Sequence, residues 1–213
     1  MNGEEMTLGA GLQQLQLVLD DHQIKQLMDY QALIAKWNKV YNLTAVRNPT
    51  EMLTHHLLDS LAVIAPLLKH LKQGKLLDVG SGAGLPGVII AICCPSIAVT
   101  CVDTVAKKAT FIKQVALELK LSNLTGLHAR VENITQPFEV ICSRAFASLA
   151  DFTNWSAGAL ASNGLWMAMK GKYPADELAA LPATIEVFHV EQLQVPQLNA
   201  ERCLVWMRKK SVS

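Results

Sequence analysis

One apolar run followed by closely spaced glycines constrains this chain more than any other stretch. Residues 76–79 are mostly apolar, glycines stand at positions 80, 82, 84 and 87, and residues 88–92 are apolar again. A strand, a glycine turn and a helix in this order begin the first unit of a nucleotide-binding α/β sheet. Glycine allows the backbone to adopt a positive φ and to approach a ligand closely. The stretch therefore predicts a ligand site after the first strand.

The register of the glycines separates two ligand classes. The run from Gly82 to Gly87 fits the G-x-G-x-x-G pattern of dinucleotide sites, which keeps an NAD-dependent oxidoreductase as one alternative. Asp78, however, precedes Gly80 by two residues, and a carboxylate there would repel a pyrophosphate. It suits a ligand with an ammonium and a sulfonium group. The series resembles the first motif of class I S-adenosylmethionine-dependent methyltransferases, which implies that Asp78, Gly80 and Gly82 bind this cofactor.

Composition excludes several classes of protein. With 51% hydrophobic and 17% charged residues in 213, the chain is expected to be globular, and no apolar stretch approaches the roughly 20 residues of a membrane span. The five cysteines are odd in number and lack C-x-x-C spacing, so we expect reduced core residues of a cytoplasmic protein and no metal site. The formal net charge is only +1, so a nucleic-acid partner would have to meet a local basic patch.

The pattern along the chain predicts two regions. Residues 1–74 read as an N-terminal helical extension packed on the core, with a capping box at Asp20 and a helix start at Asn48-Pro49; Pro66 should break or kink the second helix. Residues 75–213 alternate between strands and helices, which predicts a cofactor-binding α/β core with a doubly wound, mostly parallel sheet. The expected strands cover 75–79, 97–102, 123–128, 138–142, 165–169, 184–195 and 203–208, and a helix is expected to reach about residue 161.

Charged residues follow the predicted strands, where ligands bind in an open α/β sheet. Asp103 lies 23 residues after Gly80, close to the spacing of an acid that binds both ribose hydroxyls, and the alternative is that it caps the helix that starts near Val105. Val131 and Glu132 follow the third strand, where a loop could hold an adenine ring or could simply be solvated.

The residues at the end of the fourth strand argue against some methyl acceptors. Amino-group methyltransferases carry an Asn/Asp-Pro-Pro-aromatic box there, and this chain has Ser143-Arg-Ala-Phe146 instead. Transfer to cytosine C5 needs a nucleophilic cysteine beside a proline, and Cys94-Pro95 has the reverse order and lies away from the strand ends. Arg144 is either a functional residue or a surface ion-pair partner.

Five motifs together identify a family resemblance. They are Trp37-Asn-Lys-x-Tyr-Asn-Leu-Thr44, His56-Leu-Leu-Asp-Ser60, Asp78–Gly87, Ser143-Arg-Ala-Phe-Ala-Ser-Leu149 and Lys170-Gly-Lys172. Over residues 12–208 the chain resembles the glucose-inhibited division protein B family, the bacterial ribosomal RNA small subunit methyltransferases G. The resemblance implies a seven-stranded class I methyltransferase fold, S-adenosyl-L-methionine as the methyl donor and methylation of guanine N7 in small-subunit (16S) ribosomal RNA. It also implies cofactor-binding roles for Gly80, Leu85, Val131, Glu132 and Arg144.

The implied reaction requires no catalytic base among the side chains. Guanine N7 carries a free lone pair, so it can attack the methyl group without losing a proton, and the sequence shows no evident general base. Catalysis would then rest on positioning. Arg144, Asn42 and His56 are candidates for that role, although Asn42 and His56 could also fix the helical extension against the sheet.

Candidate RNA contacts come from both regions. The cations expected to meet RNA phosphates are Lys36, Lys39, Arg47, Arg130, Lys170 and Lys172. The expected partner is small-subunit ribosomal RNA or the assembling small subunit, with the protein acting as a monomer. Two alternatives stay open besides the oxidoreductase: a non-enzymatic assembly or RNA-binding factor that retains the cofactor fold, and a methyltransferase for small molecules.

Overall fold

Seven strands form one sheet in this computed structural model, which describes residues 3–210 and the side chains of residues 7–210. The strands are β1 (Gly74–Val79), β2 (Ile97–Asp103), β3 (Leu124–His128), β4 (Phe138–Arg144), β5 (Leu160–Lys170), β6 (Ile185–Gln192) and β7 (Cys203–Lys209). Their order is β3-β2-β1-β4-β5-β7-β6, and β7 alone runs in the direction opposite to the other six strands. The predicted doubly wound, mostly parallel sheet is confirmed, and its order reverses between β1 and β4.

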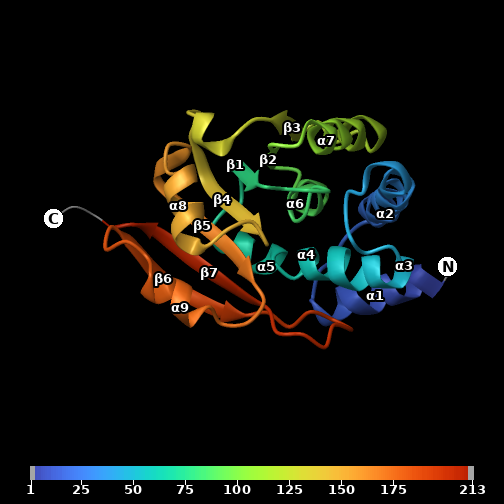
Figure 1. Cartoon of the computed structure of the whole chain (residues 1–213). Helices are drawn as coiled ribbons and strands as arrows, with labels where there is room; N and C mark the ends of the chain where they lie inside the picture. Colours follow the sequence, from blue (N-terminus) through green and yellow to red (C-terminus); the bar gives the residue numbers. More distant parts are fainter. Residues whose placement is uncertain (1–2, 211–213) are drawn as a thin grey trace.

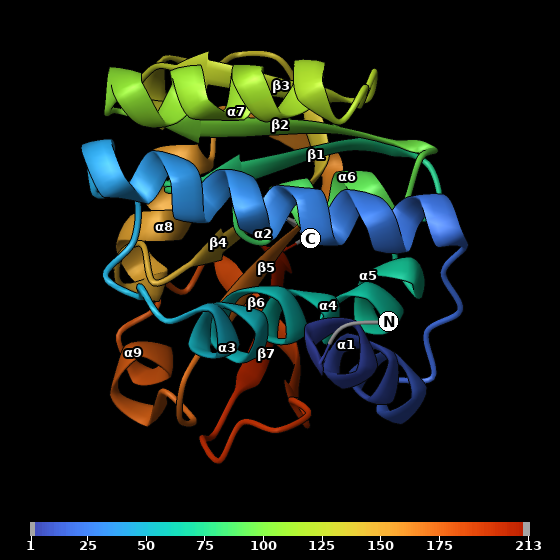
Figure 2. The same cartoon turned by 90° about the vertical axis from the view of Figure 1, so that its right-hand side faces the viewer.

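Helices cover both faces of the sheet (Figures 1 and 2). They are α1 (Gly3–Gln14), α2 (Asp21–Tyr41), α3 (Pro49–Met52), η1 (Leu53–Leu58), α4 (Asp59–Leu61), α5 (Ile64–Leu68), α6 (Gly87–Cys93), α7 (Ala106–Glu118), η2 (Val131–Asn133), α8 (Leu149–Ser156) and α9 (Ala175–Ala179). Alternate residues of each strand supply the two cores. Leu76 packs in the cluster with α2, α6 and α7, whereas Leu77 packs in the cluster with α8.

The helices before β1 are anchored to the sheet by polar and apolar contacts. Asp20 and Gln23 form the predicted capping box of α2, and Asn48 caps α3. The helix that begins at Pro49 is interrupted at residues 62–63, just ahead of Pro66. Tyr30 of α2 is fully buried and donates a hydrogen bond of 2.6 Å to the carbonyl of Ala83 in the glycine turn. The extension thus holds the glycine turn directly. The predicted boundary at residue 74, between the helical extension and the cofactor-binding core, stays a prediction.

The second half of the chain differs from the prediction in two places. The helix expected to reach residue 161 ends at Ser156, because β5 already begins at Leu160 and is much longer than the expected strand 165–169. The Ser156 hydroxyl bonds back to the Phe152 carbonyl and accepts from the Trp166 indole N–H, which joins the end of α8 to β5. The short helix α9 has no buried residue and was not predicted.

The Tyr30→Phe variant tests how much the hydrogen bond between α2 and the glycine turn contributes to stability. The change leaves the Ala83 carbonyl without its buried donor, so the free energy of unfolding in urea should fall by about 1 kcal/mol. Tyr173→Phe is the matched control, because the Tyr173 side chain is exposed. Equal stability of the two variants would contradict this role of the Tyr30 hydroxyl.

Candidate functional site

Two adjoining pockets lie where the strand order reverses, each with a volume of about 400 Å³. The arginine pocket is lined by the helices before β1, the glycine turn and the ends of β4 and β5; its residues include Thr44, His56, Asp59, Leu85, Arg144 and Arg202. The aspartate pocket is lined by the ends of β2 and β3 and by α8; its residues include Asp103, Lys108, Val131, Glu132, Phe146 and Trp155. Gly80 and Ala145 line both pockets, so one elongated ligand could occupy the two.

The glycine turn needs glycine for two separate reasons. Gly80, Gly82 and Gly84 have φ values of +65°, +59° and +96°, in the region that side chains disfavour. A Cβ at Gly80 would also collide with the Phe146 ring, whereas a Cβ at Gly82 would meet nothing closer than the Gly80 carbonyl at 4.0 Å. Gly80 therefore lets the turn lie against Phe146 at the junction of the two pockets.

Asp78 lies behind the glycine turn, and neither pocket includes it among its lining residues. It is fully buried, and its Oδ2 accepts the Gly87 N–H at 2.8 Å at the start of α6. Burial raises the pKa of Asp78 to about 7, against the lowering effect of the Gly87 N–H. The structure gives no support to the predicted direct contact with a ligand ammonium, because the carboxyl is turned to the helix start.

Asp103 lies in the aspartate pocket and also organises the local backbone. Its Oδ2 accepts the Gly82 N–H at 3.0 Å, and its Oδ1 accepts the Val105 N–H at 2.9 Å just before α7. Lys108 stands 3.6 Å from Oδ2. The carboxylate bonds to the residue that precedes α7 and does not cap the first turn of that helix. It lines the pocket where a ribose was expected, and the ribose contact stays a prediction.

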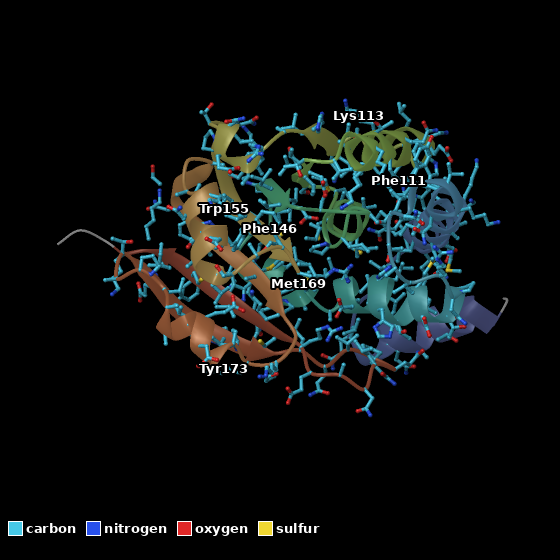
Figure 3. All side chains as sticks on the ribbon, in the orientation of Figure 1. Phe111, Lys113, Phe146, Trp155, Met169 and Tyr173 are labelled. Carbon is cyan, nitrogen blue, oxygen red and sulfur yellow. The ribbon has the colours of Figure 1, made fainter. Side chains whose placement is uncertain are left out.

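The loop after β3 forms one wall of the aspartate pocket as predicted. Val131 is buried and begins η2, and Glu132 is exposed beside it. The opposite wall contains Phe146 and Trp155, whose rings meet edge to face at 5.8 Å between centroids (Figure 3). Trp155 was not predicted, because it sits on α8 in no recognised motif. Its half-exposed ring offers the pocket an aromatic surface.

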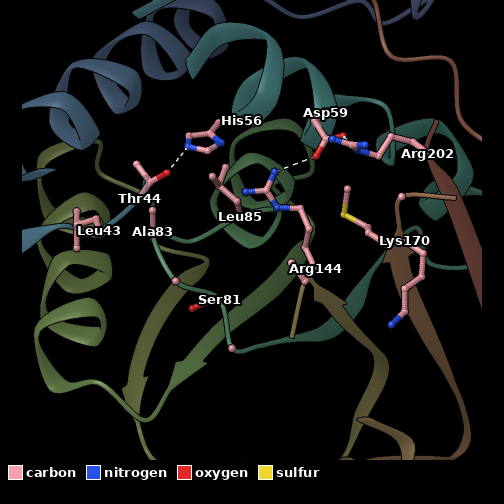
Figure 4. Close-up of a pocket in the computed structure, with 15 residues that line it drawn as sticks. Leu43, Thr44, His56, Asp59, Ser81, Ala83, Leu85, Arg144, Lys170 and Arg202 are labelled. Atoms are coloured by element: carbon pink, nitrogen blue, oxygen red, sulfur yellow. Dashed lines mark hydrogen bonds and ion pairs between the residues drawn. The ribbon is translucent and has the colours of Figure 1, made fainter. Parts of the chain in front are cut away.

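Arg144 is held by a buried carboxylate in the arginine pocket. Its Nη1 donates to Asp59 Oδ2 and to the His55 carbonyl, each at 2.9 Å. The other Asp59 oxygen accepts from Arg202 Nε at 2.7 Å. Figure 4 shows the two guanidinium groups meeting at Asp59. Asp59 and Arg202 were not predicted as site residues, although Asp59 belongs to the motif 56–60.

The two other positioning candidates lie in different surroundings. His56 lines the arginine pocket, and its Nε2 lies 2.8 Å from Thr44 Oγ1. Burial, with Arg144 nearby, lowers the pKa of His56 to about 4. Asn42 lines neither pocket. It is the exposed left-handed C-cap of α2 and accepts from Arg47 Nη2, so its observed role is to end that helix.

The predicted RNA-binding cations do not share one environment. Lys36, Lys39, Arg47, Arg130 and Lys172 are exposed. Lys170 is not free for a phosphate: its Nζ donates to Glu177 at 2.7 Å and to the Ala147 carbonyl at 2.9 Å. Because Glu177 also accepts the Leu149 N–H, this pair supports the start of α8, and the expected phosphate contact of Lys170 stays a prediction.

No helix within residues 3–210 is long and apolar enough to cross a membrane. Nor do three or more His, Cys, Asp or Glu side chains in the described chain come together as metal ligands could.

Comparisons with known proteins agree on one family. Residues 23–205 match the family model described as GidB, rRNA small subunit methyltransferase G. A protein named ribosomal RNA small subunit methyltransferase G from Polaromonas sp. (strain JS666 / ATCC BAA-500) is 73% identical, over 100% of this chain and 97% of the relative. Its namesake from Acidovorax sp. (strain JS42) is 62% identical, over 96% and 95%.

Solved structures show the same fold at low sequence identity. The Burkholderia thailandensis 1,6-didemethyltoxoflavin-N1-methyltransferase, solved with its substrate and S-adenosylhomocysteine, superimposes with a TM-score of 0.58 at 14% identity, covering 86% of this chain and 90% of that one. TrmN from Thermus thermophilus gives a TM-score of 0.57 at 18% identity, covering 74% and 53%. The class I methyltransferase fold is thereby confirmed.

Asp78→Asn should change how stability depends on pH. The folded pKa of about 7 lies above the ordinary 3.8, so the stability due to protonated Asp78 is full below pH 3.8 and is lost as the pH rises through 7. Asn keeps an acceptor for the Gly87 N–H and cannot ionise. Between pH 5.5 and 8, urea unfolding should show wild type losing on the order of 2 kcal/mol relative to the variant. A difference that does not change with pH would contradict the assignment.

Proposed function

Because the chain belongs to the rRNA small subunit methyltransferase G family, we propose that it transfers a methyl group from S-adenosyl-L-methionine to N7 of a guanine in small-subunit (16S) ribosomal RNA. The observation that carries the proposal is the pair of pockets that meet at Gly80, at the switch point of the sheet. They lie beyond the carboxyl ends of β1, β2 and β4, where a fold of this kind binds its ligand.

The two pockets match the two halves of the donor. In the aspartate pocket, Asp103 offers a carboxylate for ribose hydroxyls, and Val131 and Trp155 offer apolar surface for an adenine ring. In the arginine pocket, Arg144 offers donors for a carboxylate, beside the turn at Gly80 and Leu85. Because Gly80 has no side chain, the turn can lie against Phe146 and adds no side chain of its own to the passage between the two halves. When bound, the donor supplies an electrophilic methyl group on a sulfonium.

The residues around the arginine pocket fit an acceptor that needs no base. His56 has a pKa of about 4 and is therefore neutral at physiological pH, but as a base with so low a pKa it would be weak. Guanine N7 attacks through a lone pair and releases no proton. The chain's contribution is then to hold donor and acceptor in line, which can itself account for a large rate enhancement. Arg144 and His56 are positioned to shape that space.

The exposed cations support an RNA partner, and the cysteines support a cytoplasmic location. Exposed cations on α2, after α2 and after β3 and β5 give RNA phosphates local contacts; they are Lys36, Lys39, Arg47, Arg130 and Lys172. The five cysteines are unpaired, which suits the reducing cytoplasm. We propose a monomer that acts there on ribosomal RNA or the assembling small subunit.

Turnover is the direct test of the proposed function. Purified protein should transfer labelled methyl groups to small subunits or 16S rRNA that lack the modification, and the label should be recovered as 7-methylguanine. Binding of S-adenosylhomocysteine without transfer to any form of the substrate would instead favour a non-enzymatic assembly factor. Transfer to a metabolite pool but not to RNA would favour a small-molecule enzyme.

Gly80→Ala should weaken cofactor binding far more than Gly82→Ala. Both positions have similar positive φ values, so the backbone strain is matched, and only the Cβ at Gly80 meets Phe146. Calorimetry with S-adenosylhomocysteine should show a loss of affinity of at least about tenfold for Gly80→Ala, since moving the ring or the turn disturbs the passage. Similar affinities for the two folded variants would remove Gly80 from the proposed site.

The rate of methyl transfer should be flat between about pH 6.5 and 8.5 in single turnovers with saturating donor. Because the donor saturates the protein, an effect of Asp78 ionisation on cofactor binding does not change the measured rate. Arg144→Ala should lower cofactor affinity or the rate at every pH without introducing a titration. A rate that rises with slope one and loses this dependence in His56→Ala would show a general base and contradict N7 attack.

A further inference from the structure

One buried carboxylate in the arginine pocket binds two arginines, one at the end of β4 and one just before β7. Asp59 is 2% exposed, and its two oxygens each accept from a different guanidinium, Arg144 on one side and Arg202 on the other. Both arginine side chains are largely covered, at 21% and 23% exposure. The carboxylate thus fixes both groups at the wall of the pocket (Figure 4).

The charges around this carboxylate do not cancel. Among the residues that line the arginine pocket, Asp59 is the only acid, and it faces two guanidinium groups. Lys170 also lines the pocket, but Glu177 neutralises it from outside, and Figure 4 shows its amine directed away from Arg202. His56 is uncharged near neutral pH. The pocket therefore keeps one uncompensated positive charge, which suits an anionic group of a ligand.

Arg202 has donors left for such a group. Its Nε donates to Asp59 and its Nη1 donates to the Glu201 carbonyl; no other hydrogen bond from Arg202 is made within the described chain. A guanidinium has five N–H donors, so three remain, and their planar arrangement matches the oxygens of a phosphate. Asp59 holds the plane in place before any ligand arrives.

The two arginines lie at different distances from the glycine turn. Arg144 ends β4, which is the direct neighbour of β1. Arg202 directly precedes β7, which is three strands away from β1 in the order of the sheet. At about 4.8 Å per strand, its backbone lies roughly 14 Å from β1. Arg144 thus extends from the strand next to the turn, whereas Arg202 reaches the same carboxylate from the far strands, through its other oxygen.

We propose that Arg202, oriented by Asp59, binds a backbone phosphate of the RNA next to the nucleotide that enters the arginine pocket. The inference rests on the proposed function, because it takes the acceptor to be RNA. It assigns the two arginines to two ligands: Arg144 to the methyl donor and Arg202 to the acceptor strand.

The test compares Arg202→Met, Arg202→Lys and the control Arg208→Met. Arg208 lies on β7, the strand that follows Arg202, but it is exposed and pairs with Glu186 outside both pockets. For Arg202→Met we expect a KM for undermethylated small subunits at least about tenfold higher, with S-adenosylhomocysteine affinity within about twofold of wild type. The slope of log affinity against log salt, measured with a 16S rRNA fragment, should fall by about 0.7. Arg208→Met should change none of these.

Arg202→Lys keeps the charge without the planar fork, so the salt slope should stay while the KM rises a few-fold. It also keeps the test valid if the methionine variant does not fold. The proposal is overturned if folded Arg202→Met loses as much affinity for S-adenosylhomocysteine as for RNA, relative to wild type. It is also overturned if the salt slope of this variant equals that of wild type. If wild type transfers no methyl group at all, the proposed function fails, and the salt slope still decides whether Arg202 contacts a phosphate.

Discussion

The site depends on the carboxylate of Asp59, which ties three separate parts of the chain together. It comes from the helices before β1, and its partners come from the end of β4 and the segment before β7. Removing a carboxylate from water is costly, and two hydrogen-bonded guanidinium groups offset that cost only while both stay in place. The helical extension and the far strands therefore have to fold together for the arginine pocket to exist.

The glycine turn shows the same coupling at shorter range. Its shape is set by positive φ at three glycines, by the Tyr30 hydroxyl on Ala83 and by Asp103 on the Gly82 N–H. Those partners belong to α2 and β2, on either side of the turn. The turn is thus held in its shape before a ligand arrives, which reduces the ordering that binding would otherwise require.

Local patterns predicted the fold well, and contacts between distant segments account for what was missed. Capping at Asp20, the glycine turn and the alternation of strands and helices act through neighbouring residues, so they can be recognised in the sequence. The ion pair from Asp59 to Arg202 joins residues 143 positions apart, and nothing near either residue indicates it. Lys170 shows a partner that its motif did not indicate: the motif suggested a phosphate contact, and the structure adds an ion pair with Glu177, seven residues on.

The two acids at the ends of β1 and β2 show how burial decides the role of a carboxyl group. Asp78 and Asp103 both accept backbone N–H groups of the glycine segment, from Gly87 and Gly82. Asp78 is sealed beneath the turn, where desolvation raises its pKa to about 7, and it supports the start of α6 through the Gly87 N–H. Asp103 opens onto the aspartate pocket beside Lys108, where a ligand can reach its carboxylate. Similar positions at strand ends thus yield one fully buried acid and one that lines a pocket, and only the packing around them distinguishes the two.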